Sequence, residues 1–122
     1  MYSTGIDIVY IPRVKEWVND EVYLDRVLTR DEKGYILEKR YSHKHLATYL
    51  AAKEAVMKAL GTGWDHGVGW KDIEVVSDEN GRPAVKLYAK AKAFLGDRKA
   101  LLSIANSGDV AVAISLLKGK AL

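Results

Sequence analysis

Residues 49–63, YLAAKEAVMKALGTG, have the composition of a helix followed by two glycines around a threonine. Alanine, leucine, lysine and glutamate are all good helix formers. The pattern therefore predicts a helix from about Ser42, whose side chain is expected to cap it, to about Leu60. At about 100° per residue, the large apolar side chains of this helix share one stripe: Leu46, Leu50, Met57 and Leu60.

A second face of the same helix carries small and charged residues: Ala47, Ala51, Ala55, Glu54 and Lys58. Because alanine side chains are short, another backbone can approach this face closely. Lys53 falls inside the apolar stripe, and we interpret it as a stem that lies along apolar surface with its ammonium group in water. Glu54 and Lys58 lie one turn apart, so a surface salt bridge is the simplest interpretation of their spacing.

Upstream of this helix, the sequence predicts a strand and two shorter helices. Apolar residues alternate along residues 4–11, which predicts the strand. Pro12 suits the first position of a helix, and helical spacing continues over 13–22. Thr29 and Glu32 have the form of a capping box, so a second helix is expected to start there.

The rest of the chain contains a basic connector and then strands. The connector holds His43 and His45; two histidines can ligate a metal, but their neighbours are basic, so we expect a solvated loop. Beyond Gly69 the apolar pattern changes to period two, which predicts a hairpin. The elements after Gly69 are expected in this order: strands around 73–75 and 85–87 with a turn at 78–81, a helix over 89–95, and strands over 101–104 and 110–117. One α+β domain over residues 1–122 is the expected architecture.

Composition limits the classes of protein that this chain can be. The 122 residues are 48% hydrophobic and 29% charged, as in a globular protein that buries its own core. There is no cysteine, which excludes disulfides and thiolate metal sites and makes a reducing cytoplasm the expected location. No apolar run approaches the roughly 20 residues of a membrane span, and no signal peptide is expected. The net charge of +3 is too weak to indicate nucleic-acid binding but suits an acidic partner.

Two carboxylates are candidates for chemistry. Asp7 interrupts an otherwise apolar strand, where an unpaired buried carboxylate is costly. One interpretation leaves Asp7 exposed and pairs Glu54 with Lys58 on the helix surface. The other brings Asp7 and Glu54 together as ligands for Mg²⁺, which takes one or two carboxylates and completes its shell with water and phosphate oxygens. Lys58 would then meet the phosphate charge. The spacing leaves both interpretations open.

The segment after the helix, GTGWDHGVGW at 61–70, offers backbone N–H groups that can bind phosphate. It is not a P-loop, because its glycines follow a helix and no Gly-Lys-Ser/Thr is present. It also lacks the strand, glycines and helix of a dinucleotide fingerprint. A helix C-cap is an adequate explanation of Gly61 or Gly63, and His66 is expected to be an exposed polar residue.

Five segments resemble the holo-acyl-carrier-protein synthase family, the small bacterial 4′-phosphopantetheinyl transferases. They are GIDIV at 5–9, LTRDE at 28–32, LAAKEAVMKALGTG at 50–63, DIEVVSDENGRP at 72–83 and SGDVAVA at 107–113. The resemblance implies transfer of 4′-phosphopantetheine from coenzyme A to a serine of apo-acyl carrier protein, with release of adenosine 3′,5′-bisphosphate. It also implies Mg²⁺ dependence, an antiparallel sheet packed with the long helix, and a homotrimer whose active sites lie at subunit interfaces.

The resemblance also assigns catalytic roles. The family's metal ligands fall on Asp7 and Glu54, and its catalytic-site lysine falls on Lys58. The candidate base is Glu54 or a water on the metal, and the sequence does not choose between them. The alanines would let the coenzyme and a neighbouring chain approach the metal carboxylate.

Substrate contacts are implied in the same way. The family's coenzyme contacts fall on these residues: Lys58, Gly61, Thr62, Gly63, Gly81, Arg82 and Pro83. Arg13 and Arg26 match basic positions that meet the acidic helix of the carrier protein. The chain departs from the family at Tyr49, where many members carry arginine, and at Asn106, where many carry histidine. A non-catalytic module that binds coenzyme A or a carrier protein is the alternative, but the retained metal set favours the enzyme.

Overall fold

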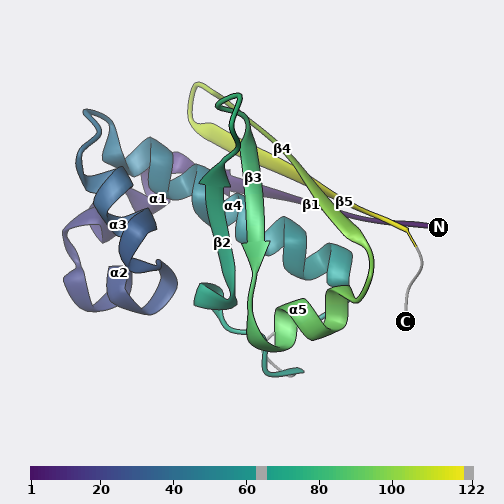
Figure 1. Cartoon of the computed structure of the whole chain (residues 1–122). Coiled ribbons are helices and arrows are strands. Elements are labelled where there is room, and N and C mark those ends of the chain that lie inside the picture. The colour runs from purple at the N-terminus through teal and green to yellow at the C-terminus, as the bar shows by residue number, and fades with distance from the viewer. Residues whose placement is uncertain (63–65, 120–122) are drawn as a thin grey trace.

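The computed structural model describes residues 1–62 and 66–119 and has the predicted α+β architecture (Figure 1). A long helix, α4, crosses one face of an antiparallel sheet, and the helices before it gather at one end of the molecule. The elements follow in this order: β1 (Tyr2–Tyr10), α1 (Ile11–Val14), the 3-10 helix η1 (Lys15–Asn19), α2 (Glu21–Val27), α3 (Arg30–Leu37), α4 (Ser42–Leu60), the 3-10 helix η3 (Trp70–Asp72), β2 (Ile73–Ser77), β3 (Pro83–Leu87), α5 (Ala89–Leu95), β4 (Lys99–Ser107) and β5 (Val110–Lys118). No helix in the described ranges is both long enough and apolar enough to cross a membrane.

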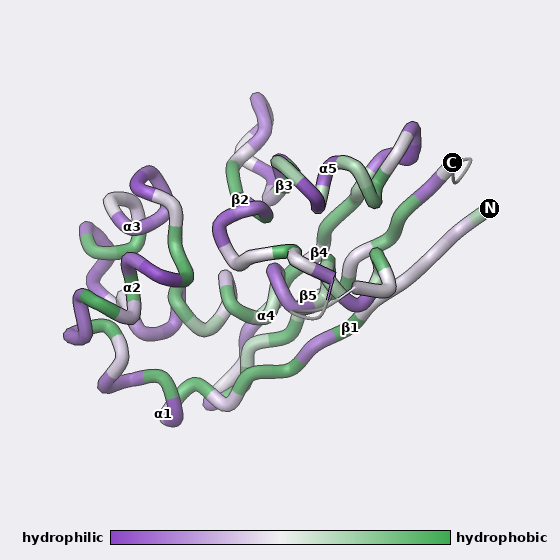
Figure 2. The backbone as a smooth tube through the Cα atoms, turned by 90° about the horizontal axis from the view of Figure 1, so that it is seen from below, coloured by the Kyte–Doolittle hydropathy of each residue, from purple (hydrophilic) through white to green (hydrophobic). Residues whose placement is uncertain are grey.

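The strands form two antiparallel sheets. One has the order β1-β5-β4, and the other is the predicted β2–β3 hairpin. In the first sheet Gly5 pairs with Ser115 and Asp7 pairs with Ala113, so these four residues share the face that α4 covers. Figure 2 shows β1 with hydrophobic stretches on both sides of a hydrophilic one. The Asp7 side chain, which interrupts the apolar pattern of β1, therefore lies on the side of the sheet that faces α4.

The small-residue face of α4 lets β1 approach closely. A Cβ atom built on Gly5 would lie only 2.0 Å from the carbonyl oxygen of Ala55 and 2.6 Å from the amide nitrogen of Ala59. Ala51, Ala55 and Ala59 are buried. The prediction of a close backbone neighbour is confirmed, but the neighbour is β1 of the same chain. The expectation that these alanines make room for a coenzyme and a second chain is wrong, because β1 covers them.

The start of α4 differs from the prediction. The N-cap residue is Tyr41, no side chain caps the helix, and Ser42 is already its first residue. The amide groups of Lys44 and His45 donate to the carbonyl oxygen of Tyr41. His43 and His45 therefore lie in the first turn of α4 and not in a loop, because backbone hydrogen bonds start the helix earlier than the basic composition suggested.

The first helical region is also broken into pieces. A continuous helix over 13–22 is wrong: α1 gives way to η1, and α2 starts at Glu21. Asp20 accepts a hydrogen bond from the amide of Tyr23 at 3.0 Å and so caps α2. Aspartate is a strong N-cap residue, and here that preference starts a new helix within an apolar pattern that continues. The capping box at Thr29 is confirmed, with both of its hydrogen bonds present.

Lys53 is not exposed at its tip, and the expectation of a solvated ammonium group is wrong. Its side chain and that of Glu32 are fully buried, and Nζ lies 2.6 Å from Glu32 Oε1. Nζ also donates to the carbonyl oxygens of Trp70 at 2.9 Å and Ile73 at 2.7 Å. Glu32 Oε2 accepts from the amide of Val75 at 2.7 Å. Burial lowers the pKa of Lys53, and the charge of Glu32 opposes this effect. The pair joins α3, α4, η3 and β2.

The other face of the three-stranded sheet is largely apolar, and no element of residues 1–62 and 66–119 buries it. Its exposed large hydrophobic residues come from all three strands: Tyr2, Ile6, Ile8, Tyr10, Leu101, Val110 and Ile114. The register places Ile6 opposite Ile114 and Tyr10 opposite Val110, so these side chains form one patch. We call this the outer sheet face.

Candidate active site

Asp7, Glu54 and Lys58 come together where β1 crosses α4. Lys58 Nζ lies 2.9 Å from Asp7 Oδ1 and donates a second hydrogen bond, of 3.1 Å, to the carbonyl oxygen of Ile6. The Lys58 side chain is 53% exposed and that of Asp7 is 16% exposed. The simplest interpretation of the spacing, a Glu54–Lys58 bridge with Asp7 exposed, is therefore wrong, because Lys58 pairs with the largely covered Asp7.

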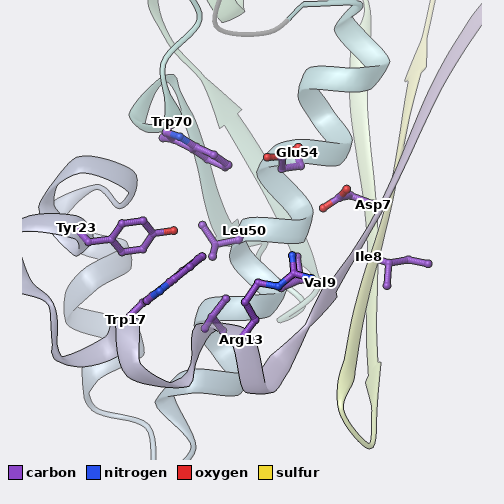
Figure 3. Close-up of a pocket in the computed structure, with 10 residues that line it drawn as sticks. Asp7, Ile8, Val9, Arg13, Trp17, Tyr23, Leu50, Glu54 and Trp70 are labelled. Carbon is purple, nitrogen blue, oxygen red and sulfur yellow. The ribbon is translucent and has the colours of Figure 1, made fainter.

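Glu54 shares the electrostatic environment of Asp7. Figure 3 shows both carboxylates directed toward the same side of one pocket. Burial raises the pKa of the Glu54 carboxyl above its usual range, the charge of Asp7 raises it further, and Lys58 opposes the shift. Two carboxylates whose charges act on each other in this way favour the binding of a cation beside them.

The pocket beside the carboxylates is lined mostly by aromatic and apolar side chains. It has a volume of about 320 Å³. Trp17, Tyr23 and Trp70 form its aromatic walls, and Arg13 lies at its edge near Asp7 (Figure 3). The remaining lining residues are Ile8, Val9, Val14, Leu50 and Glu54. A charged end and an apolar end thus share one cavity.

The donor set fits a hard divalent cation. Among residues 1–62 and 66–119, no group of three or more histidine, cysteine, aspartate or glutamate side chains could hold a metal ion. Asp7 and Glu54 would therefore supply two carboxylates and leave other positions to water and ligand oxygens. This is the coordination that Mg²⁺ prefers, since it keeps several waters and is held by one or two carboxylates with substrate phosphates.

The end of α4 uses its backbone donors internally. Gly61 adopts a φ of 74° and donates to the carbonyl oxygen of Lys58, and the amide of Thr62 donates to Met57 at 3.0 Å. These bonds close the helix as a left-handed glycine cap does. The expectation that these two amides are free to bind phosphate is therefore wrong, and the hydroxyl of Thr62 is buried without a hydrogen-bond partner. Gly63 lies outside the described residues.

Other predicted contacts lie away from this pocket. Arg82 and Pro83 line a second cavity of about 610 Å³ together with Lys99, and this cavity shares no lining residue with the first. Gly81 forms the hairpin turn with a φ of 78°. Arg26 is exposed on α2. Within one chain, Arg13 therefore lines the same pocket as Asp7 and Glu54. Arg82 lines a different cavity, and Arg26 is not among the residues that line the first pocket.

Sequence reasoning missed the aromatic walls and the buried ion pair. Trp17 falls within the helical spacing of 13–22, and no motif marks Tyr23 or Trp70 as site residues. A lysine within an apolar stripe was the signal for the buried pair, because a buried ammonium group needs a carboxylate. That partner, Glu32, was interpreted only as a capping residue.

Comparison with known proteins identifies the family. The model of the 4′-phosphopantetheinyl transferase superfamily matches residues 3–115. The holo-[acyl-carrier-protein] synthase of Geobacter sp. (strain M21) is 40% identical, and the alignment covers 97% of this chain and 98% of the relative. The protein of the same name from Geotalea daltonii is 42% identical, with the same coverage.

Solved structures agree with this assignment. The ACPS–CoA complex of Chronobacterium ammoniagenes is 31% identical, with a TM-score of 0.84 and coverage of 98% of both chains. The holo-(acyl-carrier-protein) synthase of Bacillus anthracis str. Ames, in complex with CoA (3′,5′-ADP), is 30% identical, with a TM-score of 0.80 and coverage of 97% of this chain and 96% of that one. With the fold and the family match in agreement, the chain belongs to the 4′-phosphopantetheinyl transferase superfamily.

Proposed function

We propose that this protein transfers 4′-phosphopantetheine from coenzyme A to a serine of apo-acyl carrier protein and releases adenosine 3′,5′-bisphosphate. The observation that carries the proposal is the cluster of Asp7, Glu54 and Lys58: the two carboxylates line one pocket, and Lys58 pairs with Asp7. This cluster stands in a chain that matches holo-[acyl-carrier-protein] synthases along almost its entire length.

The residues divide the chemistry as follows. The serine oxygen forms a bond to the phosphorus that bears the pantetheine arm, and the bond from that phosphorus to the bridging oxygen of the leaving nucleotide breaks. The serine proton passes to Glu54, the candidate general base that lines the pocket. Lys58 is exposed enough to leave Asp7 and neutralise negative charge on the phosphates. Asp7 and Glu54 would hold Mg²⁺, which, when bound, neutralises the charge of the diphosphate.

Recognition of the carrier is proposed to depend on Arg13 and Arg26. Both are exposed, and Arg13 lies at the edge of the pocket that holds Glu54. An acidic partner would be steered to this end of the molecule by the positive charges, which act mainly on the encounter rate. A net charge of +3 supports the same choice of partner. The absence of cysteine supports a cytoplasmic location.

We further propose that three copies assemble through the outer sheet face. That face exposes large hydrophobic residues from three strands on one regular surface, as an interface between copies would. Assembly would also let Arg82 and Pro83 of one copy contribute to coenzyme binding beside Lys58 of another. The number three comes from the family resemblance. Sedimentation velocity of the wild type and of Ile8→Glu should give a trimer and a smaller species, and a monomer with full activity contradicts this proposal.

The test of the function is direct. The protein is incubated with coenzyme A, Mg²⁺ and apo-acyl carrier protein, and the carrier is weighed by mass spectrometry. The expected result is a mass increase of one phosphopantetheine on the carrier, with none in excess chelator. A protein that binds coenzyme A and the carrier but adds no mass contradicts the proposal and identifies a binding module.

A further inference from the structure

The pocket beside Glu54 contains a polar group that the chemistry above does not use, the hydroxyl of Tyr23. The first turn of α2 fixes the backbone of this residue, because its amide donates to Asp20 Oδ1 at 3.0 Å. The Trp17 ring packs against the Tyr23 ring with 4.9 Å between centroids and 53° between planes. These contacts hold the phenol ring at the pocket wall, and Figure 3 shows its hydroxyl directed into the pocket on the side of Leu50.

The hydroxyl is available to a ligand. Within the described ranges no hydrogen bond engages it. It is also open to solvent, unlike the sealed hydroxyls of Thr62 and Ser115. Burial raises the pKa of Tyr23 and the charge of Glu54 raises it further, so the phenol keeps its proton at neutral pH. A neutral hydrogen-bond donor therefore faces the same space as the Glu54 carboxylate.

We propose that the Tyr23 hydroxyl donates a hydrogen bond to the attacking serine hydroxyl of the carrier protein and holds it beside Glu54. This inference rests on the proposed function. A serine hydroxyl has one proton and two lone pairs. In this arrangement its proton points at Glu54, one lone pair accepts from Tyr23, and the other faces the phosphorus. Tyr23 is then a positioning residue that neither takes nor gives up a proton.

The surroundings of Tyr23 explain why a phenol suits this position. The other walls of this end of the pocket, Trp17, Trp70 and Leu50, are large and apolar, and a phenylalanine ring would pack against them equally well. A carboxylate here would repel the diphosphate, and a cation would pair with Glu54 and weaken it as a base. A neutral donor orients the serine without either effect.

The substitution Tyr23→Phe tests this role, because it removes only the hydroxyl. At saturating coenzyme A and carrier, the transfer rate should fall about 2- to 12-fold, the effect of one neutral hydrogen bond. The fall should be the same at every pH, because a protonated phenol does not titrate with Glu54. The KM for coenzyme A and the thermal transition should not change. Tyr88→Phe is the matched control: its hydroxyl donates to Glu74 at 2.9 Å outside this pocket, so its rate should equal that of wild type.

The contrary outcomes are distinct. A Tyr23→Phe protein with the wild-type rate overturns the inference, as does a shift of the acid limb of the pH profile without a lower plateau. If the variant is less stable, Trp17→Phe decides: it loosens the same ring packing but keeps the hydroxyl, so an equal loss of rate shows that packing is the cause and overturns the inference. A wild type that modifies no carrier overturns this inference and the proposed function together, whereas an active wild type with an unaffected Tyr23→Phe overturns only the role of Tyr23.

Discussion

Two lysines on α4 pair with carboxylates from other elements, and their surroundings differ completely. Lys53 and Glu32 are both fully buried, and the ammonium group has three partners. Lys58 is half exposed and pairs with Asp7, which lines a pocket. A buried pair holds its geometry because breaking it leaves an uncompensated charge. An exposed pair is worth little and can exchange partners at little cost. The site around Lys53, which we call the buried site, is thus suited to stability, and the site around Lys58, about one and a half turns further along α4, which we call the open site, is suited to chemistry.

The largest effect on the transfer rate is expected at the open site, from substitution of the two carboxylates. Asp7→Asn and Glu54→Gln each keep the shape of the side chain and remove its charge. The transfer rate should fall by a factor on the order of 10³ or more, because the cation and the phosphates lose their compensating charge. Circular dichroism should show an unchanged fold. A folded variant with an unchanged rate would remove these carboxylates from the mechanism.

Substitutions at the buried site should lower the stability of the protein. Lys53→Met leaves Glu32 charged and unpaired, so the free energy of unfolding should fall by about 3–5 kcal/mol in urea denaturation. Adding Glu32→Gln should recover part of this loss. Lys33→Met is the control, since Lys33 pairs with Glu21 and Asp25 at the surface and should change stability by less than about 1 kcal/mol. A stable Lys53→Met protein without activity would mean that Lys53 takes part in the reaction, which contradicts its structural role.

Lys58→Met should show the opposite pattern to Lys53→Met. The rate should fall by about 10²–10³, the usual effect of losing one charge-stabilising group. The free energy of unfolding should change by less than about 1 kcal/mol, because the Lys58 side chain is half exposed. Lys58→Arg keeps the charge and should give an intermediate rate. A fall of several kcal/mol in the free energy of unfolding of Lys58→Met would show that both lysine pairs are structural.

How much of this comparison the sequence could predict depends on whether a feature is local. The capping box at Thr29 and the turn that ends at Gly81 depend on neighbouring residues, and both were predicted. Asp7 and Glu54 were found through their chemistry and a family resemblance. The pairing of Lys53 with Glu32 was not found, because it joins two helices through the interior and leaves no periodic signal. Asp20 was missed because the apolar pattern around it continues while its capping bond starts a new helix.

The smallest effect is the contribution of Glu54, at the open site, to the pH dependence of the protein's stability. The pKa of Glu54 is raised in the folded protein, so its ionised form is disfavoured there relative to the unfolded chain. Without metal, Glu54→Gln should therefore match wild type in acid and become more stable than wild type as the pH rises through the raised pKa. The difference should stay below about 1 kcal/mol, since the group is partly exposed. Denaturation in chelator at several pH values measures it, and a wild type that gains on the variant as pH rises would reverse the assigned direction.

The contact at Gly5 sets a limit for anyone who redesigns this protein. Glycine is a poor strand residue, so a stability-optimising algorithm would replace it with valine or threonine. Any such side chain would collide with the Ala55 carbonyl and push β1 away from α4. Asp7 lies two residues along the same strand and the same face, so it would move with β1. A thermostable variant made in this way would lose the carboxylate spacing, and libraries for improved stability should therefore leave Gly5 unchanged.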